Sequence, residues 1–144
     1  MESLVKHEPF SEETINKILK TLKFTKDGLI SVVSQQYDTG EILMVAWMNH
    51  DAIKQTLRTG DVVYWSRSRQ SLWRKGEISG QTQTLFDFRW DCDSDCLLIL
   101  INQKGVACHT GRRSCFYNAV RNKKLTEISL PEIDQKILYK NIEQ

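Results

Sequence analysis

Three aspartates alternate with two cysteines and a serine in Asp91-Cys92-Asp93-Ser94-Asp95-Cys96, and the apolar run Leu97–Ile101 follows at once. The run predicts a buried strand, so the carboxylates lie where that strand starts. In an extended chain alternate side chains share a face, which would put the aspartates on one face and Cys92 and Cys96 on the other. Like charges this close repel each other, and a bound cation would neutralise them. The hexapeptide predicts a metal centre, with a solvated acidic turn as the alternative.

The cysteines point to a second, softer metal site. All four lie between Cys92 and Cys115, and clustering of this kind in a cytosolic chain favours metal binding over disulfides. Thiolates select zinc, whereas oxygen ligands select Mg²⁺ or Ca²⁺. The spacing is compatible with a four-cysteine structural site or with a three-cysteine site that has an open position. An open site would activate water, and His109 beside Cys108 is then a candidate proton shuttle or general base.

Composition bounds the remaining choices. The chain has 144 residues, of which 40% are hydrophobic and 26% charged, as expected for a single folded domain over 1–144. A net charge of +2 does not favour nucleic acid or a membrane surface as a partner. The chain contains no run of 18 apolar residues and Met1–Phe10 lacks an apolar core, which predicts no membrane span, no signal peptide and a cytoplasmic location.

The periodicity predicts an α+β fold, strand-rich, with a mainly antiparallel sheet and short helices. Ser11 is placed to cap a helix over 11–23, and Asn49 a helix that ends near Gly60. A last helix is expected to open at Pro131. Residues 67–81 are expected to form a loop. Strands are expected over 29–35, 42–47, 62–66, 82–90 and 96–102.

Two basic stretches combine arginine with hydroxyl groups and glycine. The first runs from Ser66 to Gly76 and the second from His109 to Ser114. Guanidinium groups, hydroxyls and backbone amides together make phosphate sites. A solvated basic face is the plain alternative, and single-stranded nucleic acid stacked on Trp65 and Trp73 is another. The balanced charge and the nearby carboxylates favour a small phosphorylated ligand.

These stretches together resemble the phosphoribosyl-AMP cyclohydrolases of histidine biosynthesis. The resemblance covers about residues 28–116, and the motifs stand in the order typical of that family. The N-terminal helix and the C-terminal tail lie outside it. The matching motifs are Asp38-Thr39-Gly40-Glu41, Ala46-Trp47-Met48-Asn49, Tyr64-Trp65-Ser66-Arg67-Ser68-Arg69, Leu72-Trp73-Arg74-Lys75-Gly76-Glu77 with Ser79-Gly80, Asp91-Cys92-Asp93-Ser94-Asp95, and Ala107-Cys108-His109-Thr110-Gly111-Arg112-Arg113-Ser114-Cys115-Phe116.

The resemblance implies an enzyme that hydrolyses the N1–C6 bond of the adenine ring in phosphoribosyl-AMP and yields the formimino-AICAR ribonucleotide, the third step of histidine biosynthesis. It also implies an intertwined homodimer. By the family pattern, Asp91, Asp93 and Asp95 bind Mg²⁺, and Cys92, Cys108 and Cys115 bind Zn²⁺, with Cys92 contributed across the dimer interface. The candidate catalytic residue is His109. The candidate substrate-binding residues are Trp65, Ser66, Arg67, Arg69, Trp73, Lys75, Thr110, Arg112, Arg113 and Ser114.

Three features depart from the family pattern. Cys96 stands where a small residue without a thiol is usual, so it is not expected to be a ligand. Gln81 stands where histidine or asparagine is common. The segment after Tyr117 is too short for the fused pyrophosphohydrolase domain of many relatives, which predicts a monofunctional enzyme. The alternative function is a non-catalytic zinc module that binds RNA or nucleotides.

Overall fold

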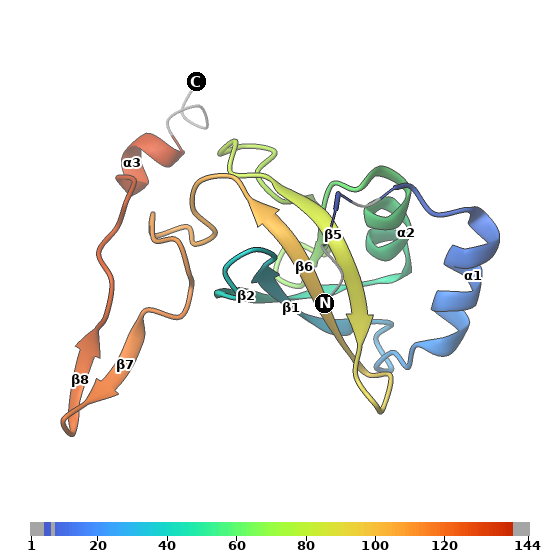
Figure 1. Cartoon of the computed structure of the whole chain (residues 1–144), viewed down its shortest axis with the longest axis horizontal. Helices are drawn as coiled ribbons and strands as arrows, with labels where there is room; N and C mark the ends of the chain where they lie inside the picture. The colour runs from blue at the N-terminus through green and yellow to red at the C-terminus, as the bar shows by residue number, and fades with distance from the viewer. Residues whose placement is uncertain (1–4, 7, 140–144) are drawn as a thin grey trace.

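A four-stranded sheet in the order β2-β1-β6-β5 forms the centre of the computed structural model, which describes residues 5, 6 and 8–139 (Figure 1). Met1–Phe10, the segment from which the absence of a signal peptide was predicted, therefore lies partly outside the described residues. The strands are β1 (Ile30–Gln36), β2 (Ile42–Met48), β5 (Gln83–Trp90) and β6 (Cys96–Gln103).

The outer pairs of this sheet are antiparallel, as predicted, but the central pair β1 and β6 is parallel. Strands joined by a short turn must run antiparallel, which holds for β1–β2 and β5–β6. A parallel pair needs a long crossover connection, and helix α2 (His50–Thr59) and four strands lie between β1 and β6 along the chain. The fold is therefore α+β and strand-rich, with a mixed central sheet.

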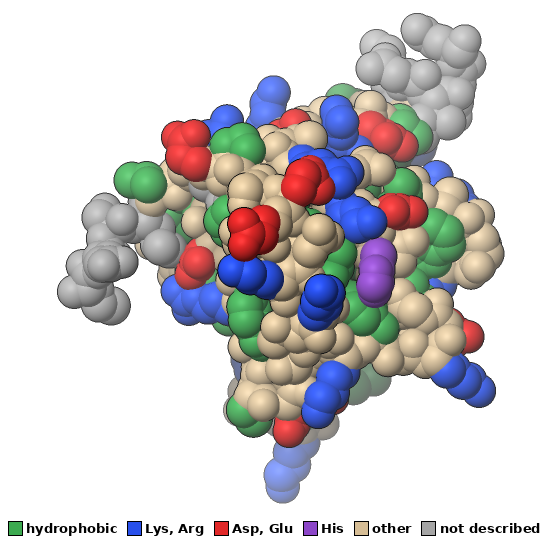
Figure 2. Space-filling view, turned by 90° about the vertical axis from the view of Figure 1, so that its right-hand side faces the viewer, with side chains coloured by type: hydrophobic (Ala, Val, Ile, Leu, Met, Phe, Trp, Pro, Cys, Tyr) green, Lys and Arg blue, Asp and Glu red, His purple; other side chains and the backbone are tan. Residues whose placement is uncertain are grey.

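The first two of the three predicted helices are present as expected. Helix α1 (Glu12–Thr21) starts at Ser11, whose side chain accepts a hydrogen bond from the Thr14 amide. Helix α2 is capped by the side chain of Asn49 and ends at Gly60, whose left-handed backbone closes it. Figure 1 shows both helices on one flank of the sheet. Their outward face carries acidic and basic side chains intermixed (Figure 2), without a patch of a single sign.

Two hairpins and a short helix complete the described fold. Strands β3 (Val63–Ser66) and β4 (Ser71–Arg74) pair antiparallel, so part of the expected loop is a strand. Strands β7 (Asn118–Arg121) and β8 (Lys124–Glu127) form a hairpin that was not expected and that projects from the body (Figure 1). The last helix, α3 (Gln135–Leu138), is capped by Asp134 rather than opened at Pro131.

One apolar core lies between the sheet, the two long helices and the β3–β4 hairpin. Residues from all of these elements are nearly inaccessible to solvent, among them Ile15 of α1, Ile53 of α2, Tyr64 of β3 and Ile99 of β6. Among the described residues, no helix combines the length and the apolar character needed to cross a membrane.

Candidate active site

The three aspartates lie together in the turn between β5 and β6. One carboxylate oxygen from each lies within 4.8 Å of those of the others, and all three residues are exposed. The extended geometry expected for 91–95 is wrong, because these residues form a tight turn in which Ser94 has a positive φ of 61°. The Asp91 carboxylate closes the turn by accepting hydrogen bonds from the amides of Asp95 (3.0 Å) and Cys96 (3.2 Å). The turn, and not strand alternation, gathers the carboxylates.

The charges of this turn affect one another. Burial alone would raise the pKa of Asp91, but the hydrogen bonds it receives from Asp95 and Cys96 prevail and lower it. The pKa of Asp95 is raised, first by its hydrogen bond with Asp91 and then by the negative charge of that carboxylate. An exposed set of oxygen ligands with this charge suits a hard cation such as Mg²⁺.

Two of the predicted zinc ligands meet at a different place. Cys108 is buried, at 4% exposure, and Cys115 is half-buried. Thr110 donates a hydrogen bond from its hydroxyl to the Cys108 sulfur over 3.1 Å, and the Cys115 amide donates to the Leu43 carbonyl over 2.7 Å. Burial raises the pKa of Cys115 to about 12, aided by the charge of Cys108 and a hydrogen bond with it. A neighbouring pair of thiols, one buried and one half-buried, is a donor set that fits zinc.

The third predicted zinc ligand does not join this pair within the chain. Cys92 is exposed in the β5–β6 turn, before the start of β6, whereas Cys108 and Cys115 follow its end. Eight strand residues span on the order of 20 Å. Cys96 begins β6 and is half-buried, also away from the pair.

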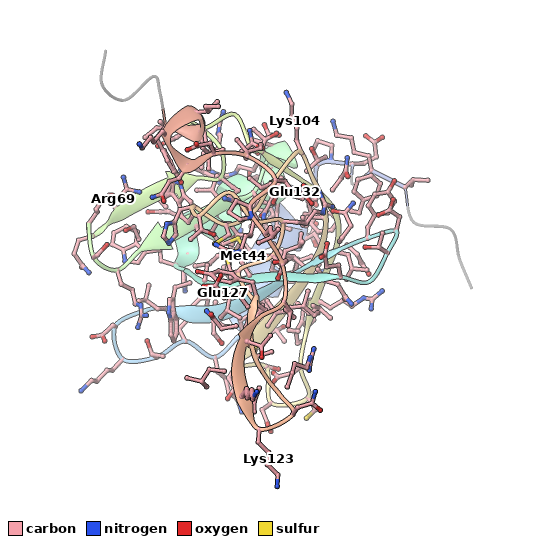
Figure 3. The ribbon with its side chains drawn as sticks, turned by 90° about the vertical axis from the view of Figure 1, so that its left-hand side faces the viewer. Met44, Arg69, Lys104, Lys123, Glu127 and Glu132 are labelled. Carbon is pink, nitrogen blue, oxygen red and sulfur yellow. The ribbon has the colours of Figure 1, made fainter. Side chains whose placement is uncertain are left out.

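The first basic stretch surrounds the β3–β4 hairpin. Trp65 and Arg67 line a cleft of about 410 Å³ together with Asn49. The Arg67 guanidinium lies 4.7 Å from the centre of the Trp47 ring. Arg69 is exposed and extends from the edge of the molecule (Figure 3). The Ser66 hydroxyl accepts a hydrogen bond from the Arg69 amide.

The second basic stretch is largely engaged within the chain. Arg112 donates to the Ser129 carbonyl and to Glu127, both over 2.9 Å, and lies 3.9 Å from the centre of the Tyr117 ring. Arg113 pairs with Glu41 over 3.1 Å, and the Ser114 hydroxyl donates to the backbone of β2. Thr110 and Arg112 line a cleft of about 660 Å³ against the C-terminal segment 130–135.

Two residues of the remaining candidate set, Trp73 in β4 and Lys75 just after it, pack toward the interior. Trp73 contacts Tyr64, with ring centres 5.6 Å apart. Lys75 is buried and donates from its ammonium to the Ala107 carbonyl over 2.7 Å. His109 is exposed beside Cys108. The structure thus brings Lys75, Thr110, Cys108 and Cys115 together, and leaves Arg67 and Arg69 at the surface.

Sequence reasoning assigned no role to Gln81 or Tyr139. The Gln81 side chain accepts a hydrogen bond from the Val106 amide over 3.0 Å, so it ties two loops together. Tyr139 follows α3, and its pKa is raised by burial and then by the charges of Cys108 and Cys115. The departure of Gln81 from the family pattern was a visible signal. The sequence contains no such signal for Tyr139, because the C-terminal tail lies outside every motif.

The family model and the relatives that match this chain all carry the same description. A family model described as phosphoribosyl-AMP cyclohydrolase matches residues 44–117, which include the aspartate turn and the thiols of Cys108 and Cys115. A Rhodospirillum centenum protein named phosphoribosyl-AMP cyclohydrolase is 55% identical over 125 residues, covering 87% of this chain and 94% of its own. A protein of the same name from Alkalilimnicola ehrlichii is 52% identical over 136 residues, covering 94% and 96%. The Rhodospirillum rubrum protein of that name is 56% identical over 119 residues, covering 82% and 83%.

Proposed function

Because the chain belongs to the phosphoribosyl-AMP cyclohydrolase family, a family of hydrolytic enzymes in histidine biosynthesis, we propose that it opens the adenine ring of phosphoribosyl-AMP. Water adds at C6, the N1–C6 bond breaks, and N1 takes up a proton, which gives the formimino-AICAR ribonucleotide. One observation carries the proposal: over most of the chain, more than half of the aligned residues are identical to those of proteins with this name. The alternative from the sequence, a non-catalytic zinc module, finds no support in those names.

The proposal assigns two metals. Cys108, Cys115 and the partner's Cys92 would hold Zn²⁺, and the aspartates of the β5–β6 turn would hold Mg²⁺. The burial of the thiol pair and the exposure of the oxygen ligands support this division, because soft and hard cations prefer these two donor types. When bound, zinc supplies the Lewis acidity that favours attack by water.

The chain's own residues would move the proton and hold the substrate. His109 is exposed and follows a proposed zinc ligand directly, which supports a role in taking a proton from the attacking water. Trp65 and Arg67 share a cleft and would hold a ring and a phosphate there. Arg69, Ser66 and Thr110 are further candidates for contacts with the two phosphates of the substrate.

A homodimer is part of the proposal, because one chain holds only two of the three thiols together. The segment that follows Cys115 also exposes apolar side chains, with Leu125 at 93% and Leu130 at 80% exposure. A two-stranded hairpin is marginally stable by itself in water, so β7–β8 would gain stability by packing against a second copy. The other exposed apolar side chains of this segment are Phe116, Val120, Ile128 and Ile137.

A direct assay tests the proposal. The purified protein is incubated with phosphoribosyl-AMP, Zn²⁺ and Mg²⁺, and the absorbance change of ring opening is followed while the bound metal is measured. We expect turnover in the parent. Cys108→Ala should lose both zinc and turnover, whereas the matched cysteine control, Cys96→Ala, should keep both. A metal-loaded protein without turnover, but with RNA binding that falls steeply with salt, would instead identify the zinc module.

A further inference from the structure

Lys75 is a buried cation without a carboxylate partner. Lys75 is 7% exposed. Among the charged residues that the structure describes, only Lys75 and Arg112 are buried. Arg112 is paired with Glu127. No aspartate or glutamate among the described residues lies within ion-pair distance of Lys75. Burying an unpaired ammonium costs free energy, so other groups around Lys75 must stabilise its charge.

The groups that contact the Lys75 ammonium are a carbonyl and an aromatic ring. Its Nζ atom donates to the Ala107 carbonyl over 2.7 Å and lies 5.3 Å from the centre of the Trp73 ring. Burial lowers the pKa of Lys75, and the negative charges of Cys115 and then Cys108 act against this. Because Ala107 directly precedes Cys108, the hydrogen bond to its carbonyl also brings the ammonium close to the thiol pair.

The hydrogen bond from Lys75 to Ala107 is one of several that fix the backbone just before Cys108. The Val106 amide donates to the Gln81 side chain, and its carbonyl accepts from Gln103 over 3.3 Å. The Ala107 amide donates to the Arg113 carbonyl over 3.0 Å. The Ala107 carbonyl completes the set through Lys75. All four backbone polar groups of residues 106 and 107 thus have partners, and Lys75 supplies the charged one.

We propose that Lys75 is a positioning residue for the thiol pair, which fixes the carbonyl next to Cys108 and places a positive charge beside the two sulfurs, and that it does not bind a substrate phosphate. The inference rests on the proposed zinc site. Three thiolates leave a net negative charge on a divalent ion, which a buried ammonium nearby balances. Burial and the bond to Ala107 also keep this ammonium away from a phosphate in solvent.

Substitutions separate this role from substrate binding. Lys75→Met keeps the length of the side chain but removes the charge and the donor, and Lys75→Arg keeps both. Lys104→Met is the matched control, since Lys104 is exposed and extends from the surface near the same loop (Figure 3). Zinc affinity is measured by competition with a chromophoric chelator, and KM and kcat are measured at saturating zinc.

We expect Lys75→Met to bind zinc roughly 10- to 100-fold more weakly, as when a group that orients a metal ligand is removed. KM for phosphoribosyl-AMP should stay within about twofold of the parent value, Lys75→Arg should recover most of the zinc affinity, and Lys104→Met should match the parent. Unchanged zinc affinity in Lys75→Met, with KM raised about tenfold, would overturn the proposal in favour of a substrate contact.

A measurement on the parent covers the case in which Lys75→Met does not fold. The ¹⁵N resonance of the Lys75 ammonium, assigned through Lys75→Arg, should shift when zinc is added to the metal-free protein and stay in place when AMP is added. A shift with AMP alone would overturn the role. A parent that turns over substrate without zinc refutes the zinc site together with this role, whereas tight zinc binding in the parent and in Lys75→Met refutes only the role of Lys75.

Discussion

The hydroxyl of Tyr64 lies 2.6 Å from the hydroxyl of Ser34 inside the core, although the two residues belong to different sheets. Tyr64 donates to the Gln83 side chain over 2.5 Å, so Ser34 is the donor to Tyr64. Gln83 in turn donates to Gln103 over 2.8 Å. Gln103 also binds the Val106 carbonyl, so a buried polar chain runs from β1 to the loop that precedes Cys108. Burial is the main reason that the pKa of Tyr64 is raised.

Tyr64→Phe should destabilise the protein by about 1–3 kcal/mol, because it leaves buried groups of Ser34 and Gln83 without their partner. The free energy of unfolding in urea measures this. Tyr37→Phe is the matched control, since Tyr37 stacks on Phe86 with ring centres 3.9 Å apart and its hydroxyl has no partner among the described residues. Equal stability of the two variants would show that the polar chain contributes nothing.

Gly111 is where the C-terminal segment rests on the thiol loop. Its carbonyl accepts hydrogen bonds from the amides of Glu132 and Ile133, its φ is +87°, and an added Cβ would overlap the Ile133 carbonyl oxygen. Gly111→Ala should therefore release this segment and make it sensitive to protease. Gly28→Ala is the control, because Gly28 has a φ of +76° but open space around it. It should cost only the backbone strain, about 1–2 kcal/mol, without the protease sensitivity.

The two basic stretches should respond differently to loss of an arginine. Arg67→Met should raise KM for phosphoribosyl-AMP and leave stability and metal content nearly unchanged, since Arg67 is exposed and lines an open cleft. Arg112→Met should lower the melting temperature, because it removes the bonds to Glu127 and Ser129 that anchor the tail. Steady-state kinetics and thermal unfolding of both variants test this. The reverse assignment of the two effects would contradict it.

Helices α1 and α2 are joined by a two-pronged ion pair, in which Arg58 donates to both carboxylate oxygens of Glu12 over 2.6 and 2.8 Å. The hydrogen bond from Arg58 is the main reason that the pKa of Glu12 lies below its ordinary value of 4.5. A carboxylate with a lowered pKa in the folded state stabilises the fold above its unfolded pKa and loses this effect as the pH falls.

Arg58→Met should therefore melt below the parent near neutral pH, and the difference should shrink as the pH falls through 4.5 and below. High salt should also reduce it, because the pair is exposed. Arg69→Met, at an exposed arginine without an ion pair among the described residues, is the control. A difference in melting temperature that stays constant with pH would exclude the ion pair as its cause.

Local signals in the sequence predicted local structure well. Ser11 and Asn49 cap their helices as expected, because capping depends on a few neighbouring residues. The parallel pairing of β1 with β6 was not predictable in this way, since it joins distant parts of the chain. Arg74 and Lys75 are adjacent and chemically alike, yet one is exposed and the other buried. Tertiary packing decides which of the two is buried, and the sequence, which made Lys75 a candidate for substrate binding, does not show its burial.

The separation of Cys92 from the buried thiol pair leads to a test of the proposed dimer. If each zinc site takes Cys108 and Cys115 from one chain and Cys92 from the other, Cys92→Ser and Cys108→Ser homodimers should both be inactive. Unfolding and refolding the two variants together should restore activity, because a mixed dimer holds one site with all three thiols intact. Equal mixing should recover about one quarter of the parent activity, since about half of the dimers are mixed and each has one working site.

Three outcomes decide this last prediction. Recovered activity that elutes with a dimer on size exclusion, together with zinc bound in proportion to it, supports a shared site. A mixture of Cys108→Ser with Cys115→Ser is the matched control and should recover nothing, because every possible site then lacks a thiol from the same buried pair. Activity in the Cys92→Ser protein by itself would remove Cys92 from the ligand set, and the open turn between β5 and β6 would keep only its carboxylates as metal ligands.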